Sequence, residues 1–217
     1  MDNLFKKTVQ CSVCDNSFES AKVRRSKVAV KSIDTDFFTV YRGDNPLFYL
    51  VYICPHCGFG FTENFKKPTE EMQEAFLKLL SPLPGDYSGH RTLEMGIQAY
   101  ERALECAHLL NTKNQVLAGL TLHLTWFYRE AGNSEKENEY LQKALDYFTA
   151  AYEREVESGT LAKTLYLMGE LSRRLGDERR AVQCFGRIIG DQTIRDAGII
   201  RMARERWQEL RNNDTDL

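Results

Sequence analysis

The chain has 217 residues, of which 42% are hydrophobic and 28% are charged, a composition typical of globular proteins. Its net charge is −2 at pH 7, and no stretch approaches the ~18 consecutive apolar residues of a membrane-spanning helix. The first residues, MDNLFKKTVQCSVC, have neither the apolar segment nor the small-residue cleavage site of a secretory signal. We therefore expect a cytoplasmic protein with no membrane partner, in which paired cysteines favour metal binding or catalysis over disulfides.

Residues 1–67 have a β-rich pattern. The segments SKVAVKSI, DFFTVYR and LFYLVYI are rich in β-branched and aromatic residues, and the turn-forming cluster RGDNP separates the last two. We predict a hairpin whose strands are Phe37–Tyr41 and Leu47–Ile53, with Cys54 at the end of the second strand. This region contains ten lysines and arginines against seven acidic residues, a balance of only +3.

From Pro68 onward the hydrophobic residues follow a helical period. The sequence thus predicts an α+β fold that is mostly α, in which a zinc-ribbon-like β region (1–67) precedes an antiparallel helical domain (68–217). Gly132 and Gly176 mark helix–helix turns. The predicted helices are Pro68–Leu80, Arg91–Leu110, Lys113–Ala131, Glu135–Glu157, Leu161–Leu175, Asp177–Ile189 and Ile194–Arg211.

The helical domain contains an internal repeat. Its clearest copy, LYLMGELSRRLGDERRAVQCFGRII, resembles a tetratricopeptide (TPR) repeat, with Gly169, Gly176, Ala181 and Phe185 at the small, turn, small and aromatic positions. Small residues let the paired helices approach closely, and large residues fill the gap between successive pairs. The spacing between copies exceeds the standard of about 34 residues, which predicts an irregular TPR-like array. The alternative is a generic helical bundle.

Four cysteines form two Cys-x-x-Cys pairs, CSVC at Cys11 and Cys14 and CPHC at Cys54 and Cys57. Two intervening residues allow both sulfurs of a pair to point into one tight turn, and two such turns give a tetrahedral four-sulfur site typical of zinc. Gly58 and Asp15 follow the pairs and suit the positive φ of such turns. We predict a structural zinc ion at these four cysteines.

Iron would accept the same ligands, and a redox role would require one pair to be metal-free with a low thiol pKa. Four cysteines already close the site, so we expect His56 to be a spectator and the metal to have no catalytic role. Cys106 and Cys184 lie singly in predicted helices and are expected to be core residues. The absence of phosphate-loop, nucleophile-elbow and zinc-protease motifs favours a protein that is not an enzyme.

A TPR-like array would line a concave groove with the first helix of each pair. Aromatic, acidic and arginine side chains there could hold a peptide with acidic groups. The alternative is a solvated helix face. The predicted groove residues that could bind a partner are Trp126, Arg129, Lys163, Tyr166, Glu170, Arg173 and Arg174, with Leu122 and Glu130 beside them.

The segment AKVRRSKVAVK is the basic run of the β region. Cations alternating with apolar residues on a strand could contact a nucleic-acid backbone, but the favoured interpretation is an edge strand protected by charge. The residues concerned are Lys22, Arg24, Arg25, Lys27 and Lys31.

The sequence resembles an uncharacterised bacterial family of unknown function. The resemblance is carried by KKTVQCSVCDNSFESAKVRRSK and DTDFFTVYRGDNPLFYLVYICPHCGFG, most specifically by DTDF, NPLFY and CPHCG. It implies a two-knuckle metal-binding region joined to TPR-like helices, and no activity. The first pair departs from the expected Cys-Pro-x-Cys. The sequence thus predicts a zinc-stabilised protein-interaction protein, with nucleic-acid binding or thiol redox chemistry as alternatives.

Overall fold

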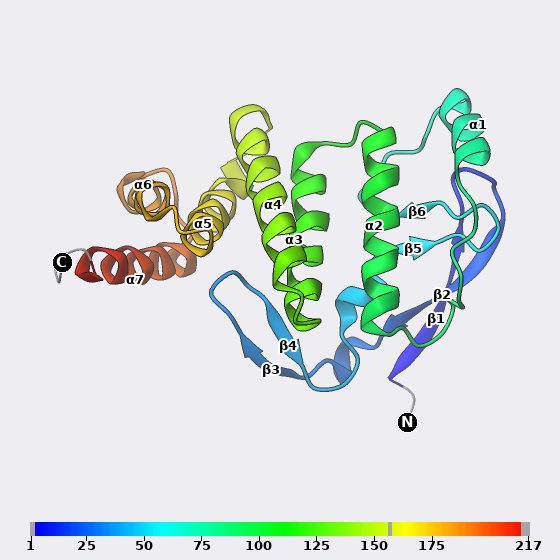
Figure 1. Cartoon of the computed structure of the whole chain (residues 1–217), viewed down its shortest axis with the longest axis horizontal. Coiled ribbons are helices and arrows are strands. Elements are labelled where there is room, and N and C mark those ends of the chain that lie inside the picture. The colour runs from blue at the N-terminus through cyan, green and yellow to red at the C-terminus, as the bar shows by residue number, and fades with distance from the viewer. Residues whose placement is uncertain (1–2, 156–157, 214–217) are drawn as a thin grey trace. The chain divides into compact units, whose positions relative to one another are not determined.

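The computed structural model describes residues 3–155 and 158–213. The described residues form three separate two-stranded antiparallel sheets and seven α-helices, so the predicted α+β, mostly α, fold class is confirmed (Figure 1). Within these residues, all strands precede the first α-helix in the chain.

The strands pair as sequence neighbours. β1 (Leu4–Gln10) pairs with β2 (Ser17–Val23) from Leu4↔Val23 to Gln10↔Ser17. β3 (Val30–Ile33) pairs with β4 (Thr39–Tyr41) across a register irregularity, and β5 (Tyr52–Ile53) pairs with β6 (Gly60–Phe61). Two short 3-10 helices, η1 (Arg25–Lys27) and η2 (Pro46–Tyr49), lie between strands.

The helices follow the predicted pattern closely, and the predicted helix end at Glu157 lies outside the described residues. Thr69 begins the first one by accepting a hydrogen bond from the backbone N–H of Met72. Gly132 and Gly176 have φ values of 70° and 82°, as expected at the predicted turns. The helices are α1 (Glu70–Leu79), α2 (Leu93–Leu109), α3 (Asn114–Glu130), α4 (Ser134–Arg154), α5 (Ser158–Arg174), α6 (Glu178–Gly190) and α7 (Ala197–Asn213).

The predicted hairpin between Phe37–Tyr41 and Leu47–Ile53 is wrong. Asn45 accepts a hydrogen bond from the N–H of Leu47 through its side chain, and Pro46 supplies the fixed φ of a helix start, so the chain forms η2 instead of a strand. The partner of β4 is β3, and the partner of β5 is β6. Side-chain capping therefore overrode the β-rich composition of LFYLVYI.

The described chain divides into two compact units. The first contains residues 3–112 and 120–137, and the second contains residues 113–119, 138–155 and 158–213. α3 therefore contributes to both units. The predicted boundary between residues 67 and 68 stays a prediction.

Within the first unit, α2 packs against β6 and η2, and the buried Arg91 anchors the loop before it. Arg91 is 2% exposed, and its five guanidinium hydrogen bonds go to backbone carbonyls and one hydroxyl. Burial lowers the pKa of Arg91 to about 10. The acceptors are the carbonyls of Phe48, Val51 and Tyr87 and the hydroxyl of Ser20.

Within the second unit, α6 packs against both α5 and α7. Gly169 of α5 lies against Phe185 of α6, because a Cβ on Gly169 would lie 2.6 Å from Cε1 of Phe185. The Tyr166 ring lies 5.7 Å from the Phe185 ring. A small residue on α5 therefore receives a large residue from α6.

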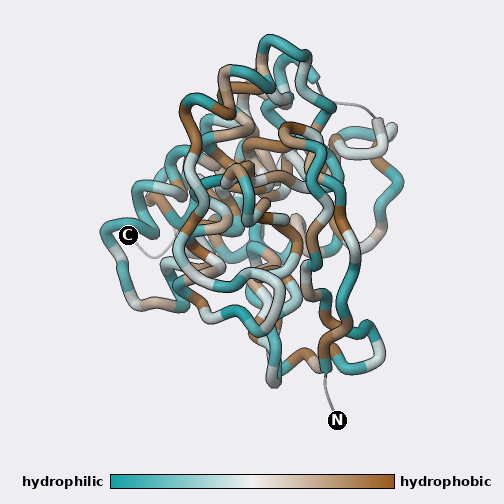
Figure 2. The backbone as a smooth tube through the Cα atoms, turned by 90° about the vertical axis from the view of Figure 1, so that its right-hand side faces the viewer, coloured by the Kyte–Doolittle hydropathy of each residue, from teal (hydrophilic) through white to brown (hydrophobic). Residues whose placement is uncertain are grey.

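Hydrophobic and hydrophilic residues alternate at short intervals along the backbone (Figure 2). No helix within residues 3–155 and 158–213 combines the length and hydrophobicity that a membrane crossing requires.

Candidate metal centre

The two Cys-x-x-Cys pairs occupy equivalent turns. Cys11 and Cys14 lie between β1 and β2, where the N–H of Cys11 donates to the carbonyl of Asn16 (3.0 Å) and that of Asp15 donates to Cys11 (3.0 Å). Cys54 and Cys57 lie between β5 and β6. The N–H of Cys54 donates to Phe59 (3.0 Å), and that of Gly58 donates to Cys54 (2.9 Å). The same two bonds thus define each knuckle.

The residue after each pair has positive φ, as the sequence predicted. Asp15 has φ 59° and Gly58 has φ 77°. Asp15 is exposed, whereas a Cβ on Gly58 would lie 2.0 Å from the carbonyl oxygen of Ser81. The Arg102 guanidinium of α2 donates to the carbonyls of Gly58 (2.8 Å) and Ser81 (2.9 Å). The second knuckle is therefore fixed against the loop between α1 and α2, and only glycine fits there.

The four sulfurs converge on one point. All four Sγ atoms of Cys11, Cys14, Cys54 and Cys57 lie within 4.8 Å of one another. The Sγ–Sγ distances between Cys11 and Cys57 and between Cys14 and Cys54 are both 3.6 Å. Sulfurs about 2.3 Å from a tetrahedral ion would be about 3.8 Å apart, so the cluster has the size of a single-ion site.

Three of these cysteines are buried. Cys11 and Cys54 are 0% exposed, and Cys14 is the one that reaches partly into solvent. The Asn16 amide donates to the sulfur of Cys14 (3.4 Å). The cluster is part of a hydrophobic core that also contains Val13, Phe18, Tyr52, Phe59, Phe76 and Cys106.

The thiols perturb one another strongly. Hydrogen bonding with Cys54 raises the pKa of Cys11 to about 12, and burial adds to this rise. Hydrogen bonds from Cys11 and Cys57 lower the pKa of Cys54, and backbone N–H groups of Cys57 and His56 lower it further. Hydrogen bonds with Cys11 and Cys54, together with burial, raise the pKa of Cys57. Four thiolates this close together would repel one another, so a cluster of four deprotonated sulfurs requires a cation.

The sequence of this chain matches that of a known bacterial family. The sequence model of the family described as "Uncharacterized protein conserved in bacteria (DUF2225)" matches residues 4–210. The chain belongs to the DUF2225 family. No curated protein and no solved structure matches this DUF2225 chain.

The structure also places the histidine of the second knuckle and the two cysteines outside the cluster. His56 of the DUF2225 chain is exposed and is not part of the four-sulfur cluster. Cys106 and Cys184 are buried core residues, and burial raises the pKa of Cys106 to about 11.

The five basic residues of the segment AKVRRSKVAVK fall into two groups that differ in burial. Lys22 is partly buried, with its Nζ 4.3 Å from the centre of the Tyr52 ring. Arg24, Arg25, Lys27 and Lys31 are exposed, and the Arg24 guanidinium lies 5.5 Å from the centre of the Phe5 ring.

A polar cluster beside the metal centre was missed by sequence reasoning. Lys7 donates to the Tyr52 hydroxyl (3.2 Å) and to Glu63 (2.8 Å), and that hydroxyl donates to Glu63 (2.7 Å). Hydrogen bonds from Lys7 and Tyr52 lower the pKa of Glu63 to about 2. No spacing connects positions 7, 52 and 63, so only the three-dimensional structure reveals the cluster.

The predicted groove residues differ in burial and belong to both units. In the first unit, Trp126 is buried and Arg129 is largely buried. In the second unit, Tyr166 and Glu170 are buried, and Arg173 donates to Glu170 (2.9 Å). Lys163 is exposed, and Arg173 and Arg174 are partly buried. Their role in binding a partner stays a prediction.

Proposed function

We propose that this protein is a zinc-stabilised, cytoplasmic interaction protein without catalytic activity of its own. The observation that carries the proposal is the closed four-sulfur cluster, in which Cys11, Cys14, Cys54 and Cys57 supply every position of a tetrahedral ion. Such a site leaves no coordination position for a substrate. The role that fits it is to hold the two knuckles together.

The β region requires stabilisation of the kind that a bound metal ion provides. Its sheets have two strands each, and β5 and β6 have two residues each, which is too little for independent stability. A structural zinc ion contributes its binding energy directly to folding. Zinc is favoured over a single iron ion because the four-cysteine zinc site is the common structural one, although the sulfur geometry accommodates both.

The helical region supports the interaction part of the proposal. In support, Gly169 of α5 approaches Phe185 of α6 closely, as a small residue of a TPR-like motif would. Arrays of this kind bind peptides or proteins along the first helices of their pairs. The partner class that we propose is a protein or peptide, which TPR-like grooves hold through side chains such as Trp126 and Arg129.

The deciding experiment measures metal in protein purified under reducing conditions without added metal. We expect about one zinc per chain by elemental mass spectrometry, and four thiols that react only after denaturation with a chelator. One iron per chain would instead indicate electron transfer. Protein without metal, in which the Cys-x-x-Cys pairs readily form disulfides, would contradict the structural role and favour thiol redox chemistry.

A second candidate is nucleic-acid binding. Two observations favour it. Arg24, Arg25, Lys27 and Lys31 are exposed, and the Arg24 guanidinium lies beside the exposed ring of Phe5. Cations combined with an aromatic surface suit single strands. A salt-dependent mobility shift with RNA or DNA that disappears in the Arg24→Ala, Arg25→Ala double variant would support it. No shift at low salt would exclude it.

A further inference from the structure

The turn between β3 and β4 contains the sequence DTDFF, residues 34–38. The N–H of Asp34 donates to the carbonyl of Phe38 (2.8 Å), and the N–H of Phe37 donates to that of Asp34 (3.0 Å). Phe37 has φ 69°, a backbone conformation that bulky residues rarely adopt. A strained turn of this kind persists only where other contacts hold it in place.

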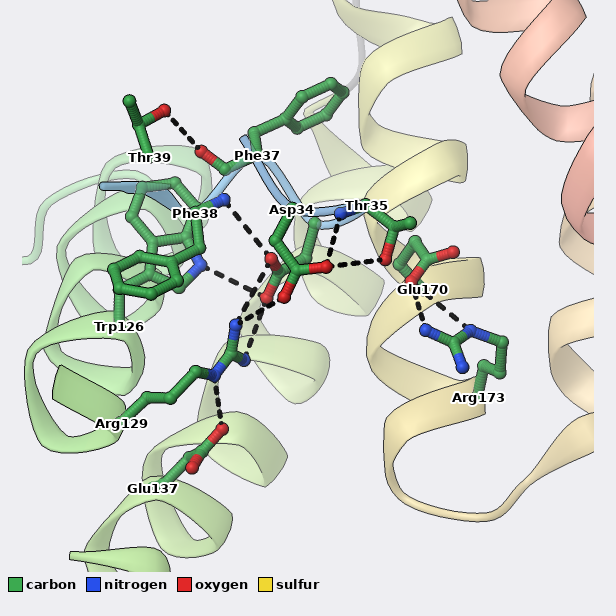
Figure 3. Close-up of polar contacts among 11 residues, drawn as sticks. Asp34, Thr35, Phe37, Phe38, Thr39, Trp126, Arg129, Glu137, Glu170 and Arg173 are labelled. Carbon is green, nitrogen blue, oxygen red and sulfur yellow. Dashed lines mark hydrogen bonds and ion pairs between the residues drawn. The ribbon is translucent and has the colours of Figure 1, made fainter. Parts of the chain in front are cut away.

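α3 supplies part of this support. Asp36 is 0% exposed, and both of its carboxylate oxygens accept hydrogen bonds from α3 side chains. Oδ2 accepts from the Trp126 indole (3.2 Å) and from Arg129 Nη2 (2.9 Å). Oδ1 accepts from Arg129 Nη1 (3.3 Å) and from the N–H of Phe38 (3.2 Å). Arg129 thus binds the carboxylate with two parallel hydrogen bonds (Figure 3).

The α3 surface around Asp36 contacts an aromatic side chain as well as carboxylates. The Phe38 ring lies 6.3 Å from the Trp126 ring and 5.3 Å from the Arg129 guanidinium. Asp34 adds a second carboxylate at 3.3 Å from Arg129 Nη1. Glu137 binds the opposite edge of the guanidinium at 2.6 Å, which fixes its orientation. Trp126 and Arg129 lie three residues apart on α3, so they share one face.

The β3–β4 hairpin has little support of its own. All four residues of β3 are exposed, including Val30 at 47% and Ile33 at 62%. Among the described strands its only partner is β4, and their register is irregular. An isolated two-stranded sheet is marginally stable. The contacts of residues 34–38 with α3 therefore contribute to holding the hairpin in place.

We infer that the α3 surface around Trp126 and Arg129 is a binding site for acidic–aromatic peptide segments, and that residues 34–38 occupy it in the unliganded protein. The occupant is a segment of another protein with a carboxylate two positions before an aromatic ring, as in Asp36 and Phe38. This inference rests on the proposed interaction function and specifies its partner chemistry. The segment would bind by displacing the hairpin.

The test uses the fluorescence of Trp126. The chain has two tryptophans, so Trp207→Phe leaves Trp126 as the sole reporter. The probe is a capped peptide of residues 33–39, IDTDFFT, and the matched control peptide is INTNFFT. In the full-length protein, Asp34→Asn with Asp36→Asn removes the charges of the resident segment and leaves Arg129 intact.

We expect the double Asn variant to bind IDTDFFT at least tenfold more tightly than the Trp207→Phe parent, because the resident segment no longer competes at high effective concentration. Adding Arg129→Gln should abolish binding, and INTNFFT should not bind. Equal affinities for the variant and its parent, or binding that survives Arg129→Gln, would overturn the inference. Retained helical circular dichroism and metal content verify that each variant is folded.

A second measurement avoids variants that alter the buried Asp36. In the unmodified protein, hydrogen exchange of amides 30–41 should be faster than that of α3 and should accelerate further with excess IDTDFFT. Phe38→Ala, which keeps both carboxylates, should increase this exchange as well. Amides of β3 and β4 as protected as those of α3, and unaffected by the peptide, would make the hairpin a fixed structural element and refute the inference. Either failure leaves the metal-content test of the proposed function unaffected.

Discussion

The β-rich residues 3–67 and the helices α5–α7 are stabilised by different kinds of contact. In the β region, sheets of two strands are joined by groups distant in sequence, such as the Cys11 and Cys57 sulfurs. In α5–α7, each helix packs against its neighbour in the chain. Changes in the β region should therefore act through single groups, and changes in the helices through packing at particular positions.

The largest effect should follow loss of a sulfur ligand. Cys54→Ser removes a fully buried member of the cluster, and we expect it to abolish metal binding and unfold the β region, because metal binding and folding are coupled. Most of the helical circular dichroism signal should remain. Limited proteolysis should cut first within residues 3–67.

Cys184→Ser is the matched control, because Cys184 is buried in α6 and is not part of the cluster. It should keep a full complement of metal. Loss of the helical signal in Cys54→Ser would show that the helices depend on the metal centre and would erase the contrast between the regions.

A smaller effect should follow Arg91→Lys. Lysine keeps the positive charge but cannot reach three carbonyls and the Ser20 hydroxyl at once, so buried acceptors lose their donors. We expect a destabilisation of about 3–5 kcal/mol in urea unfolding followed by Trp126 fluorescence in the Trp207→Phe background. Arg25→Lys changes an exposed arginine and should cost less than about 0.5 kcal/mol. Equal destabilisation by the two substitutions would show that the buried Arg91 guanidinium contributes no more to stability than an exposed arginine.

The smallest effect concerns packing in the helices. Gly169→Ala places a methyl group 2.6 Å from Phe185 and should destabilise by about 1–3 kcal/mol. Gly186→Ala on α6 meets its nearest atom, Trp207 Nε1, at 3.6 Å and should be neutral or stabilising by up to about 1 kcal/mol. Thermal unfolding followed by circular dichroism compares the two, and shifts of the same sign would contradict the packing of α5 against α6.

The contrast between local contacts in the helices and long-range contacts in the β region also explains what the sequence could predict. Helical periodicity and the turn glycines Gly132 and Gly176 are local signals, and the helices they predicted are present. The knuckles could also be predicted, because two cysteines and the residue after them define each turn. The pairing of β3 with β4 could not, since Asn45 and Pro46 redirected the following segment into η2.

The side-chain clusters were harder to predict than the elements. Trp126 and Arg129 were expected to face a partner, but no spacing indicates that Asp36, 90 residues before Trp126, bonds to both. Arg91 gave no signal at all, because an arginine before a helix is usually exposed. Bonds that join distant positions leave no period in the sequence.

The chain positions of the sulfur ligands also constrain how the protein is made. Cys11 and Cys57 are 46 residues apart, and Arg91 and Ser20 are 71 apart. At a synthesis rate of about 5–20 residues per second, the roughly 50 residues from Cys57 to the end of α2 take about 3–10 s to emerge from the ribosome. During that interval the thiols of the β region are accessible, because the later segments of its core have not yet been synthesised. The region at the N-terminus is thus the one that completes its fold late, whereas α5 and α6 can pair as soon as both are synthesised.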